Sequence, residues 1–233
     1  MNEYWVKMGI SEEVFNELSF KLTQSMKYSA EKTTRETHAD EDSFFTKFMG
    51  RLVKIEFGDG YYIDFQDSKT TSKGKNSAEK KYGCDFGLRV DFIGNNSSFP
   101  KAIIGQAKNF PRNSPRDNST EQKRLAEQCS KMAKVTPNYI VTFRPNRDGQ
   151  IPVIYLGDMN TGSYLAKSIR FDEYLLKYVL PCYHGETEKD VIKYMVSATH
   201  EGWTEYLRIF PIKTNLPKPS PSPENKITPM KRQ

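Results

Sequence analysis

Apolar residues near the start of the chain recur with the period of an α-helix. Val14, Leu18 and Leu22 lie four residues apart, and a serine followed by two glutamates precedes them. Serine at the cap and acids in the first turn are typical of a helix N-terminus. The pattern predicts a first helix over residues 11–26. Residues 28–38 are rich in Thr, Lys and Glu and are predicted to be a loop or a frayed helix.

The next stretch changes from helical to strand periodicity. A second helix is predicted over residues 40–52, because five apolar residues share one face. These residues are Phe44, Phe45, Phe48, Met49 and Leu52. Alternating residues then flank Asp59-Gly60, which predicts a β-hairpin over residues 53–65. Residues 67–81 carry five lysines and are predicted to form a flexible basic loop, either as a solvated charge run or in contact with phosphates.

Two further apolar runs end in polar groups. The first begins at Asp85 and reaches about Ile93, and the second covers residues 101–108. A cluster of turn-forming residues at 94–98 separates them, so the two runs are predicted to pair as an antiparallel hairpin. That pairing brings Asp85 to the same end of the hairpin as Lys108.

The remaining pattern predicts a layered α/β fold. A helix over residues 120–134, with Leu125, Ala126, Cys129, Met132 and Ala133 on one face, precedes a strand at 138–143, which implies a parallel crossover. Further elements are predicted as a strand at 151–156, a helix at 171–180 ended by Pro181, a short helix at 191–199 and a strand at 205–210. Pro152 marks its strand as an edge strand or as a strand start. We expect one α/β domain over residues 1–215, with a mixed sheet of four or five strands flanked by helices.

The composition indicates which class of partner to expect and argues against several kinds of protein and site. The 233 residues include 35 Lys and Arg against 29 Asp and Glu, and the net charge of +6 favours anionic partners, nucleic acid first. A mean hydropathy of −0.71 predicts exposed loops, and the Pro- and Ser-rich residues 216–233 are predicted to be a disordered tail. Three widely spaced cysteines argue against a disulfide framework or a zinc site and favour a reduced, cytoplasmic compartment. No signal peptide or membrane span is predicted.

The polar ends of the hairpin predict a metal site. Asp85 supplies a carboxylate, Gln106 an amide oxygen and Ala107 a backbone carbonyl, which are the hard oxygen ligands that Mg²⁺ or Mn²⁺ prefers. Gln106 and Lys108 are two residues apart and so project from the same face of their strand. Lys108 would then face a scissile phosphate and either hold the attacking water or offset charge in the transition state. The alternative is an ordinary surface aspartate and a strand-ending lysine.

The run Gly83-Cys84-Asp85-Phe86, followed by Ile104-Gly105-Gln106-Ala107-Lys108, resembles the PD-(D/E)xK nuclease superfamily. It is most similar to the branch with glutamine in place of the second acid, as in Mrr-type restriction nucleases and related phage-defence effectors. The resemblance covers about residues 40–143 and implies a restriction-endonuclease-like core that cleaves DNA with a metal ion. Asp85 would be the metal-binding acid, Gln106 the substituted acid position and Lys108 the catalytic lysine. Cysteine, not proline, precedes Asp85 here.

The resemblance also implies supporting residues. A further acid often comes from an N-terminal helix, where Glu41 is the first candidate and Glu79 the second. The alternative for Glu41 is an acid in the first turn that only stabilises the positive end of its own helix dipole. The helix after the Gln-x-Lys strand often offers a polar side chain, for which Gln122 and Gln128 are candidates. Basic residues around the hairpin are candidates for DNA binding: Lys75, Lys80, Lys81, Arg112, Arg116 and Lys123. His38, His184 and His200 are isolated and are predicted to be surface or cap residues.

These inferences converge on one hypothesis, with rivals. The chain is predicted to be a Mg²⁺- or Mn²⁺-dependent endonuclease that acts on DNA, in defence against foreign DNA, in the cytoplasm. A chain of 233 residues has little room for a separate reading domain, so we expect non-specific cutting, or control by a homo-oligomer or a defence-system partner, and not self-contained site specificity. The alternatives are a non-catalytic nucleic-acid-binding or interaction module on the same fold, and an RNA nuclease.

Overall fold

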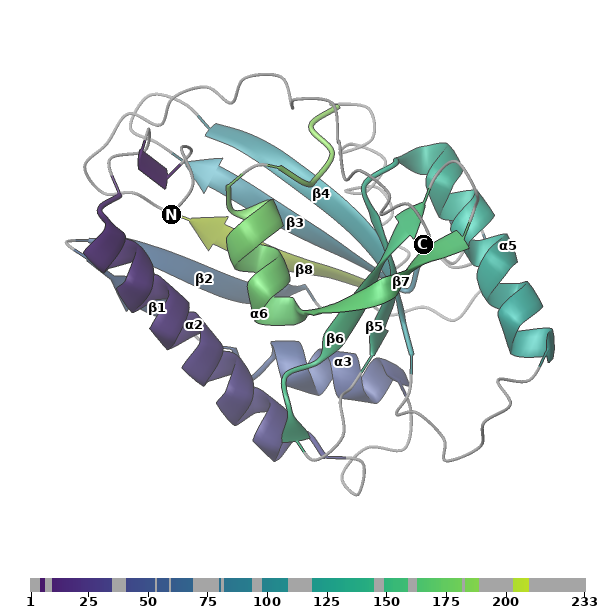
Figure 1. Ribbon diagram of the computed structural model, residues 1–233, viewed down its shortest axis with the longest axis horizontal. Coiled ribbons are helices and arrows are strands. Elements are labelled where there is room, and N and C mark those ends of the chain that lie inside the picture. Colours follow the sequence, from purple (N-terminus) through teal and green to yellow (C-terminus); the bar gives the residue numbers. More distant parts are fainter. Residues whose placement is uncertain are drawn as a thin grey trace, which may run out of the picture.

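In the part of the chain that the structure describes, eight strands form one mixed β-sheet with helices against both faces (Figure 1), in the order β1-β2-β8-β3-β4-β5-β6-β7. This computed structural model describes residues 5–6, 10–34, 41–52, 54–58, 60–68, 80, 82–93, 98–108, 119–144, 149–158, 163–181, 183–188 and 203–209. The strands are β1 Ile55–Phe57, β2 Tyr61–Ser68, β3 Phe86–Ile93, β4 Ser98–Ala107, β5 Tyr139–Arg144, β6 Val153–Asp158, β7 Ser163–Arg170 and β8 Trp203–Ile209. The helices are α2 Glu12–Lys32, α3 Glu41–Met49, α5 Ser119–Val135 and α6 Phe171–Tyr174, which continues as the π-helix η3 Leu175–Val179.

Helix α2 begins as predicted but runs further. Ser11 caps it by accepting a hydrogen bond from the Val14 backbone N–H at 3.2 Å. The helix then continues to Lys32, although its last turn is polar and was expected to be a loop or to fray. The reason is tertiary: Ser29 is fully buried and its hydroxyl donates to the Phe48 carbonyl oxygen at 2.6 Å. One buried hydrogen bond and the packing of Ala30 thus outweigh the weak local pattern.

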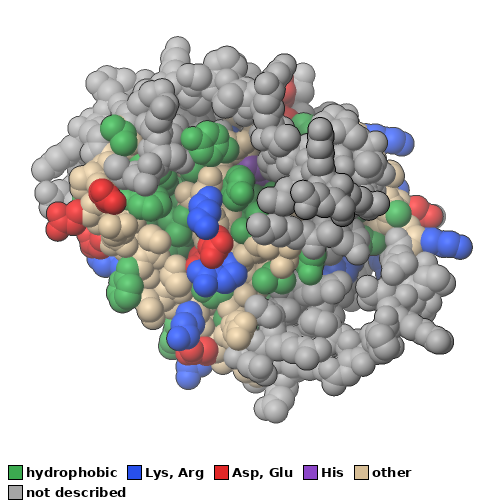
Figure 2. All heavy atoms as spheres, viewed as in Figure 1, with side chains coloured by type: hydrophobic (Ala, Val, Ile, Leu, Met, Phe, Trp, Pro, Cys, Tyr) green, Lys and Arg blue, Asp and Glu red, His purple; other side chains and the backbone are tan. Residues whose placement is uncertain are grey.

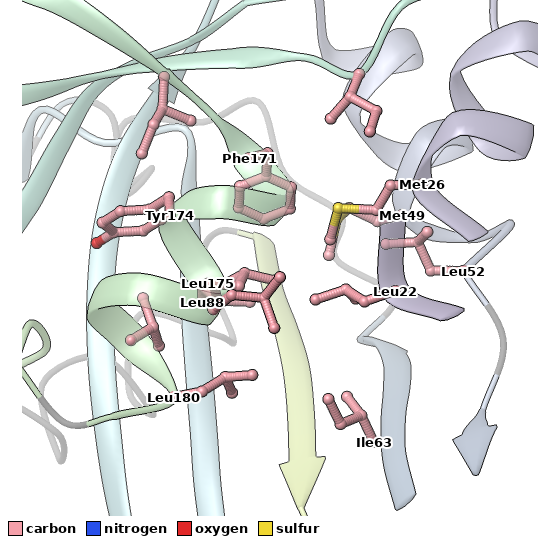
Figure 3. Packing of buried hydrophobic residues seen from close by; sticks show 14 of the residues in the cluster. Leu22, Met26, Met49, Leu52, Ile63, Leu88, Phe171, Tyr174, Leu175 and Leu180 are labelled. Carbon is pink, nitrogen blue, oxygen red and sulfur yellow. The ribbon is translucent and has the colours of Figure 1, made fainter. Parts of the chain in front are cut away.

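The larger core lies on the face of the sheet that α2, α3 and α6 cover (Figure 3). The predicted apolar face of α3 is confirmed, because Phe44, Phe45, Phe48 and Met49 are buried. Leu52 is buried too, but it lies beyond the helix, which ends at Met49 and not at residue 52. In Figure 3, Leu22 and Met26 of α2 point towards Phe171 and Leu175, with Ile63 and Leu88 of the sheet beneath. The π-helical turn of η3 is closed by a hydrogen bond from the Leu180 N–H to the Leu175 carbonyl at 2.9 Å.

The opposite face carries a smaller core under α5. It contains Cys84, Ala102, Ile104, Cys129, Met132 and Tyr139. Cys129 and Met132 come from the predicted apolar face of α5, and both are buried. Ala126 was predicted to share that face but is exposed, because the side of α5 that packs against the sheet is narrower than the predicted apolar face.

The two predicted hairpins are confirmed, and so is the parallel crossover. β1 pairs antiparallel with β2, β3 pairs antiparallel with β4, and β4 pairs parallel with β5 after α5. The expected four or five strands are too few. β7 follows a polar stretch and was not predicted, and β8 lies inside the sheet between β2 and β3. Pro152 precedes β6, which is a strand start and not an edge, since β6 lies between β5 and β7.

Several predictions concern parts of the chain outside the described residues. They include the helix at 191–199, most of the basic loop at 67–81 and the tail at 216–233. Within the described residues, none of the helices has a stretch long and apolar enough to cross a bilayer.

Candidate active site

The β3–β4 hairpin brings the three predicted residues together. Phe86 pairs with Gly105, so Asp85 lies one step before β3 and opposite Gln106. The Asp85 N–H extends the ladder by donating to the Gly105 carbonyl at 2.8 Å. Lys108 follows directly after β4, on the same side as Gln106. Cross-strand pairing thus explains the cluster, as the sequence predicted.

Side-chain hydrogen bonds join the three residues into one chain. The Gln106 Nε2 donates to Asp85 Oδ1 at 3.1 Å, and the Lys108 Nζ donates to Gln106 Oε1 at 2.8 Å. The other carboxylate oxygen of Asp85 accepts from the Ala107 backbone N–H at 3.0 Å. Gln106 is fully buried, whereas Asp85 and Lys108 are half-buried. The carboxylate and the ammonium are therefore held apart by a neutral amide and remain reachable from solvent.

Gly83 completes this cluster, and the sequence did not assign it a role beyond its place in the motif. Its carbonyl oxygen accepts a second hydrogen bond from Gln106 Nε2. Its φ of +76° lies in the left-handed region that favours glycine. A Cβ at this position would lie 3.0 Å from the Gln128 Cα and closer still to the Gln128 carbonyl oxygen. Only glycine therefore lets this turn pack directly on α5. The signal in the sequence was a glycine two residues before the predicted acid.

An irregularity in β5 lies beside Gln106. From Gly105 to Ala107, β4 advances two residues, while its partner β5 advances three residues, from Ile140 to Phe143. The pairing of β5 with β6 shifts at the same place, between Ile140 and Thr142. An extra residue of this kind bends a strand and re-aims side chains, and such bulges are over-represented next to active sites.

Helix α5 covers the cluster on its buried side. Lys108 lies near enough to Cys129 to stabilise its thiolate, but burial dominates and raises the pKa of Cys129 to about 11. Gln128, a candidate polar residue, is buried with its backbone against Gly83. The Lys131 Nζ donates to the Lys80 carbonyl at 3.1 Å and so ties the segment before the cluster to the same helix.

The donor set fits a divalent ion at one carboxylate. A carboxylate offers about four lone-pair sites and can hold a metal ion as well as accept hydrogen bonds, and Mg²⁺ is commonly bound by one or two carboxylates together with phosphates and water. Gln106 and Ala107 were the other two predicted ligands. The side-chain oxygen of Gln106 accepts a hydrogen bond from Lys108, and the backbone N–H of Ala107 donates to Asp85. Within the described part of the chain, no group of three or more His, Cys, Asp and Glu side chains lies together as a metal site.

The other predicted site residues have different outcomes. Lys80 and Lys123 are described and exposed. Glu41 is the first residue of α3, and the side chains of Glu41 and Gln122 are not among those described. The remaining candidates lie outside the described residues: Glu79, Lys75, Lys81, Arg112 and Arg116.

One of the histidines corrects a prediction. His184 was expected at the surface or at a cap, but it is buried, and its Nδ1 is hydrogen-bonded to the Tyr174 hydroxyl. The buried Lys101 donates to the His184 carbonyl at 2.8 Å. The pattern missed this because residues 183–186 pack back against β4, where Glu186 bridges Ala102. His38 and His200 lie outside the described residues.

Comparison of the chain with family models, with curated proteins and with solved structures finds no match.

Proposed function

We propose that this protein is a metal-dependent nuclease that hydrolyses DNA phosphodiester bonds, with a restriction-endonuclease-like core. The observation that carries the proposal is the joint placement of Asp85 and Lys108, linked through Gln106 at one end of a hairpin. This arrangement supports the resemblance to PD-(D/E)xK nucleases with a Gln-x-Lys element. The proposed role in defence against foreign DNA rests on that resemblance alone.

Asp85, Lys108 and Gln106 would each have a separate role in the reaction. Asp85 would hold a Mg²⁺ or Mn²⁺ ion, together with phosphate oxygens, water and the Ala107 carbonyl. That ion would polarise the scissile phosphate and lower the pKa of a bound water. Lys108 carries its ammonium on the same side of the hairpin, where it can orient the attacking water and offset negative charge on the phosphate oxygens. Gln106 fixes the direction of the Lys108 ammonium through its Oε1.

Charge on α5 supports a polyanionic substrate. The exposed charged side chains described on this helix are four basic and one acidic: Lys123, Arg124, Lys131, Lys134 and Glu127. On α2, by contrast, three exposed acids balance three exposed lysines. Figure 2 shows such mixing on the face it presents, where basic and acidic side chains are interspersed. Nucleic acid would therefore follow α5, beside the cluster, and binding should weaken with salt.

The test uses two substitutions that preserve side-chain size. Asp85→Asn and Lys108→Met are assayed on supercoiled plasmid with Mg²⁺ or Mn²⁺, after circular dichroism shows that both are folded. Loss of a group that stabilises transition-state charge typically costs about 100- to 1000-fold in rate. Lys27→Met, on the exposed face of α2, is the matched control and should cut as the wild type does. Undiminished cutting by both site variants would refute the assignment.

A second function is favoured by one observation. Asp85 is the only acid in the described cluster, because the facing position is the neutral Gln106. Such a site has only one carboxylate to hold a metal ion, so the alternative function is to bind nucleic acid without cutting it. Calorimetry discriminates the two: DNA binding without any Mg²⁺ or Mn²⁺ binding would favour the non-catalytic module. Parallel assays on DNA and RNA substrates decide between a deoxyribonuclease and an RNA nuclease.

A further inference from the structure

The orientation of the Gln106 amide is fixed by the chemistry of its neighbours. The Gly83 carbonyl and the Asp85 carboxylate can only accept hydrogen bonds, so the atom that faces them must be the NH₂ group. The Lys108 ammonium can only donate, so the atom that faces it must be Oε1. A flipped amide would set acceptor against acceptor at two contacts and donor against donor at the third. The two ends of this amide are therefore not interchangeable.

This orientation assigns both donors of Gln106 to the protein itself. One hydrogen of the NH₂ group goes to a backbone carbonyl and the other to the acid of the site, and the side chain is fully buried. An amide placed in this way holds Asp85 by the carboxylate and Lys108 by the ammonium. It does so without a metal ion, because every contact is already complementary in charge.

We propose that Gln106 is a positioning residue, whose amide fixes Asp85 and Lys108 in the metal-free protein and gives no ligand to the metal. On this proposal the glutamine has a role of its own, which the acid of the PD-(D/E)xK pattern would not fulfil at this position. A glutamate here would turn a carboxylate oxygen towards the Gly83 carbonyl and the Asp85 carboxylate, inside the protein. Two carboxylates that face one another repel, which favours protonation of one of them or capture of a cation. The proposal rests on the proposed nuclease function for the role of the metal, but its first test does not need cleavage.

The test compares Gln106→Met, Gln106→Glu and Gln24→Glu, the last being an exposed glutamine on α2 that controls for added charge. Urea unfolding is followed in EDTA at pH 5 and pH 8. Gln106→Met should unfold at a clearly lower urea concentration than the wild type, since it removes the amide that donates to the Gly83 carbonyl and to Asp85 Oδ1. Gln106→Glu should be least stable at pH 8, and acid, or Mn²⁺ added in place of EDTA, should restore much of the loss. Gln24→Glu should show neither effect.

Two further readouts separate positioning from a merely structural role. In ¹⁵N-labelled protein in EDTA, the Gln106 side-chain amide protons should exchange slowly with solvent, and Asp85→Asn should shift their resonance. If the nuclease is active, Gln106→Met should lower kcat by about 100-fold while KM changes little, because a misplacement of about 1 Å has that cost.

Opposite results would overturn the proposal. If Gln106 serves only as a metal ligand, Gln106→Met will be as stable as the wild type in EDTA, and Mn²⁺ binding measured by calorimetry will weaken at least tenfold. Wild-type stability of Gln106→Glu at pH 8 without metal would overturn it as well. Failure of the wild type to bind any divalent ion would refute the nuclease proposal but leave the stability comparison intact, so the two failures are distinguishable.

Discussion

Gly83 is the position where a single methyl group should disturb both the fold and the site. In Gly83→Ala the new side chain meets two obstacles. The φ of +76° costs about 1–2 kcal/mol for a residue with a Cβ. The Cβ also lies 3.0 Å from the Gln128 Cα and closer to its carbonyl oxygen, and backbone of α5 cannot move away as a flexible side chain can. Overpacking of this kind typically adds about 1–3 kcal/mol.

The two terms predict that Gly83→Ala lowers the free energy of unfolding by about 2–5 kcal/mol. Gly149→Ala is the matched control, because Gly149 has a similar φ of +68°, while its Cβ would lie 3.1 Å from the Glu31 Cα and farther from other backbone. The control should therefore lose mainly the conformational term of about 1–2 kcal/mol. Both variants have a tight contact with a helix Cα, at 3.0 Å and 3.1 Å, so the difference between them reports mainly the additional clash with the Gln128 carbonyl oxygen. The effects of alanine on the unfolded chain cancel.

Urea unfolding monitored by circular dichroism measures both values. Under the proposed nuclease function, plasmid cleavage gives a second readout at a temperature where both variants stay folded. Gly83→Ala shifts the carbonyl that accepts from Gln106 and should reduce cutting, whereas Gly149→Ala should not. Equal destabilisation by the two alanines would refute the claim that α5 packs against Gly83. Strong destabilisation with normal cutting would separate Gly83 from the site.

Two further predictions concern buried titratable groups. Burial and the nearby Lys101 lower the pKa of His184 from 6.5 to about 3, so the unfolded chain takes up this proton below about pH 6.5 while the folded chain does not. Stability should therefore be greatest above pH 6.5 and fall towards pH 3, by up to about 1.4 kcal/mol per pH unit, and urea unfolding of His184→Asn should show a flatter profile; parallel profiles would contradict this. Burial raises the pKa of Cys129 to about 11, so at pH 8 iodoacetamide should alkylate it about 100-fold more slowly in the native than in the unfolded protein, as peptide mapping by mass spectrometry would show. Equal rates in the two states would show that Cys129 is not buried in solution.

Local periodicity predicted the elements whose pattern and packing agree. The apolar face of α3 and the β3–β4 hairpin follow directly from spacing, and the hairpin alone was enough to bring Asp85 opposite Gln106. Where the pattern was weak, tertiary contacts decided. The last turn of α2 is polar, yet it persists because Ser29 bonds inside the core. β7 has no strong apolar run, but it forms because it pairs with the side of β6 that β5 leaves open.

The same division explains which parts of the site could be predicted. The sequence predicts that Gln106 and Lys108 share a face, because strand alternation requires it. It does not predict which end of the amide faces which neighbour, since that depends on the Gly83 carbonyl, a backbone atom placed by contact with α5. His184 was missed for a related reason: its burial comes from a chain return against β4 that no local pattern indicates.

The geometry of the cluster therefore depends on the frame around it, which consists of β4, the turn at Gly83 and helix α5, more than on its own three side chains. Asp85 is fixed by ladder pairing with Gly105, by the Ala107 N–H and by Gln106, and Gln106 is fixed in turn by Gly83, in the turn that packs against α5. These contacts come from strand β4 or from the turn packed on α5, and sites built on helices and strands are held more precisely than sites on loops. Substitutions that leave Asp85, Gln106 and Lys108 intact but alter this frame should therefore lower activity almost as much as substitutions of the three residues themselves.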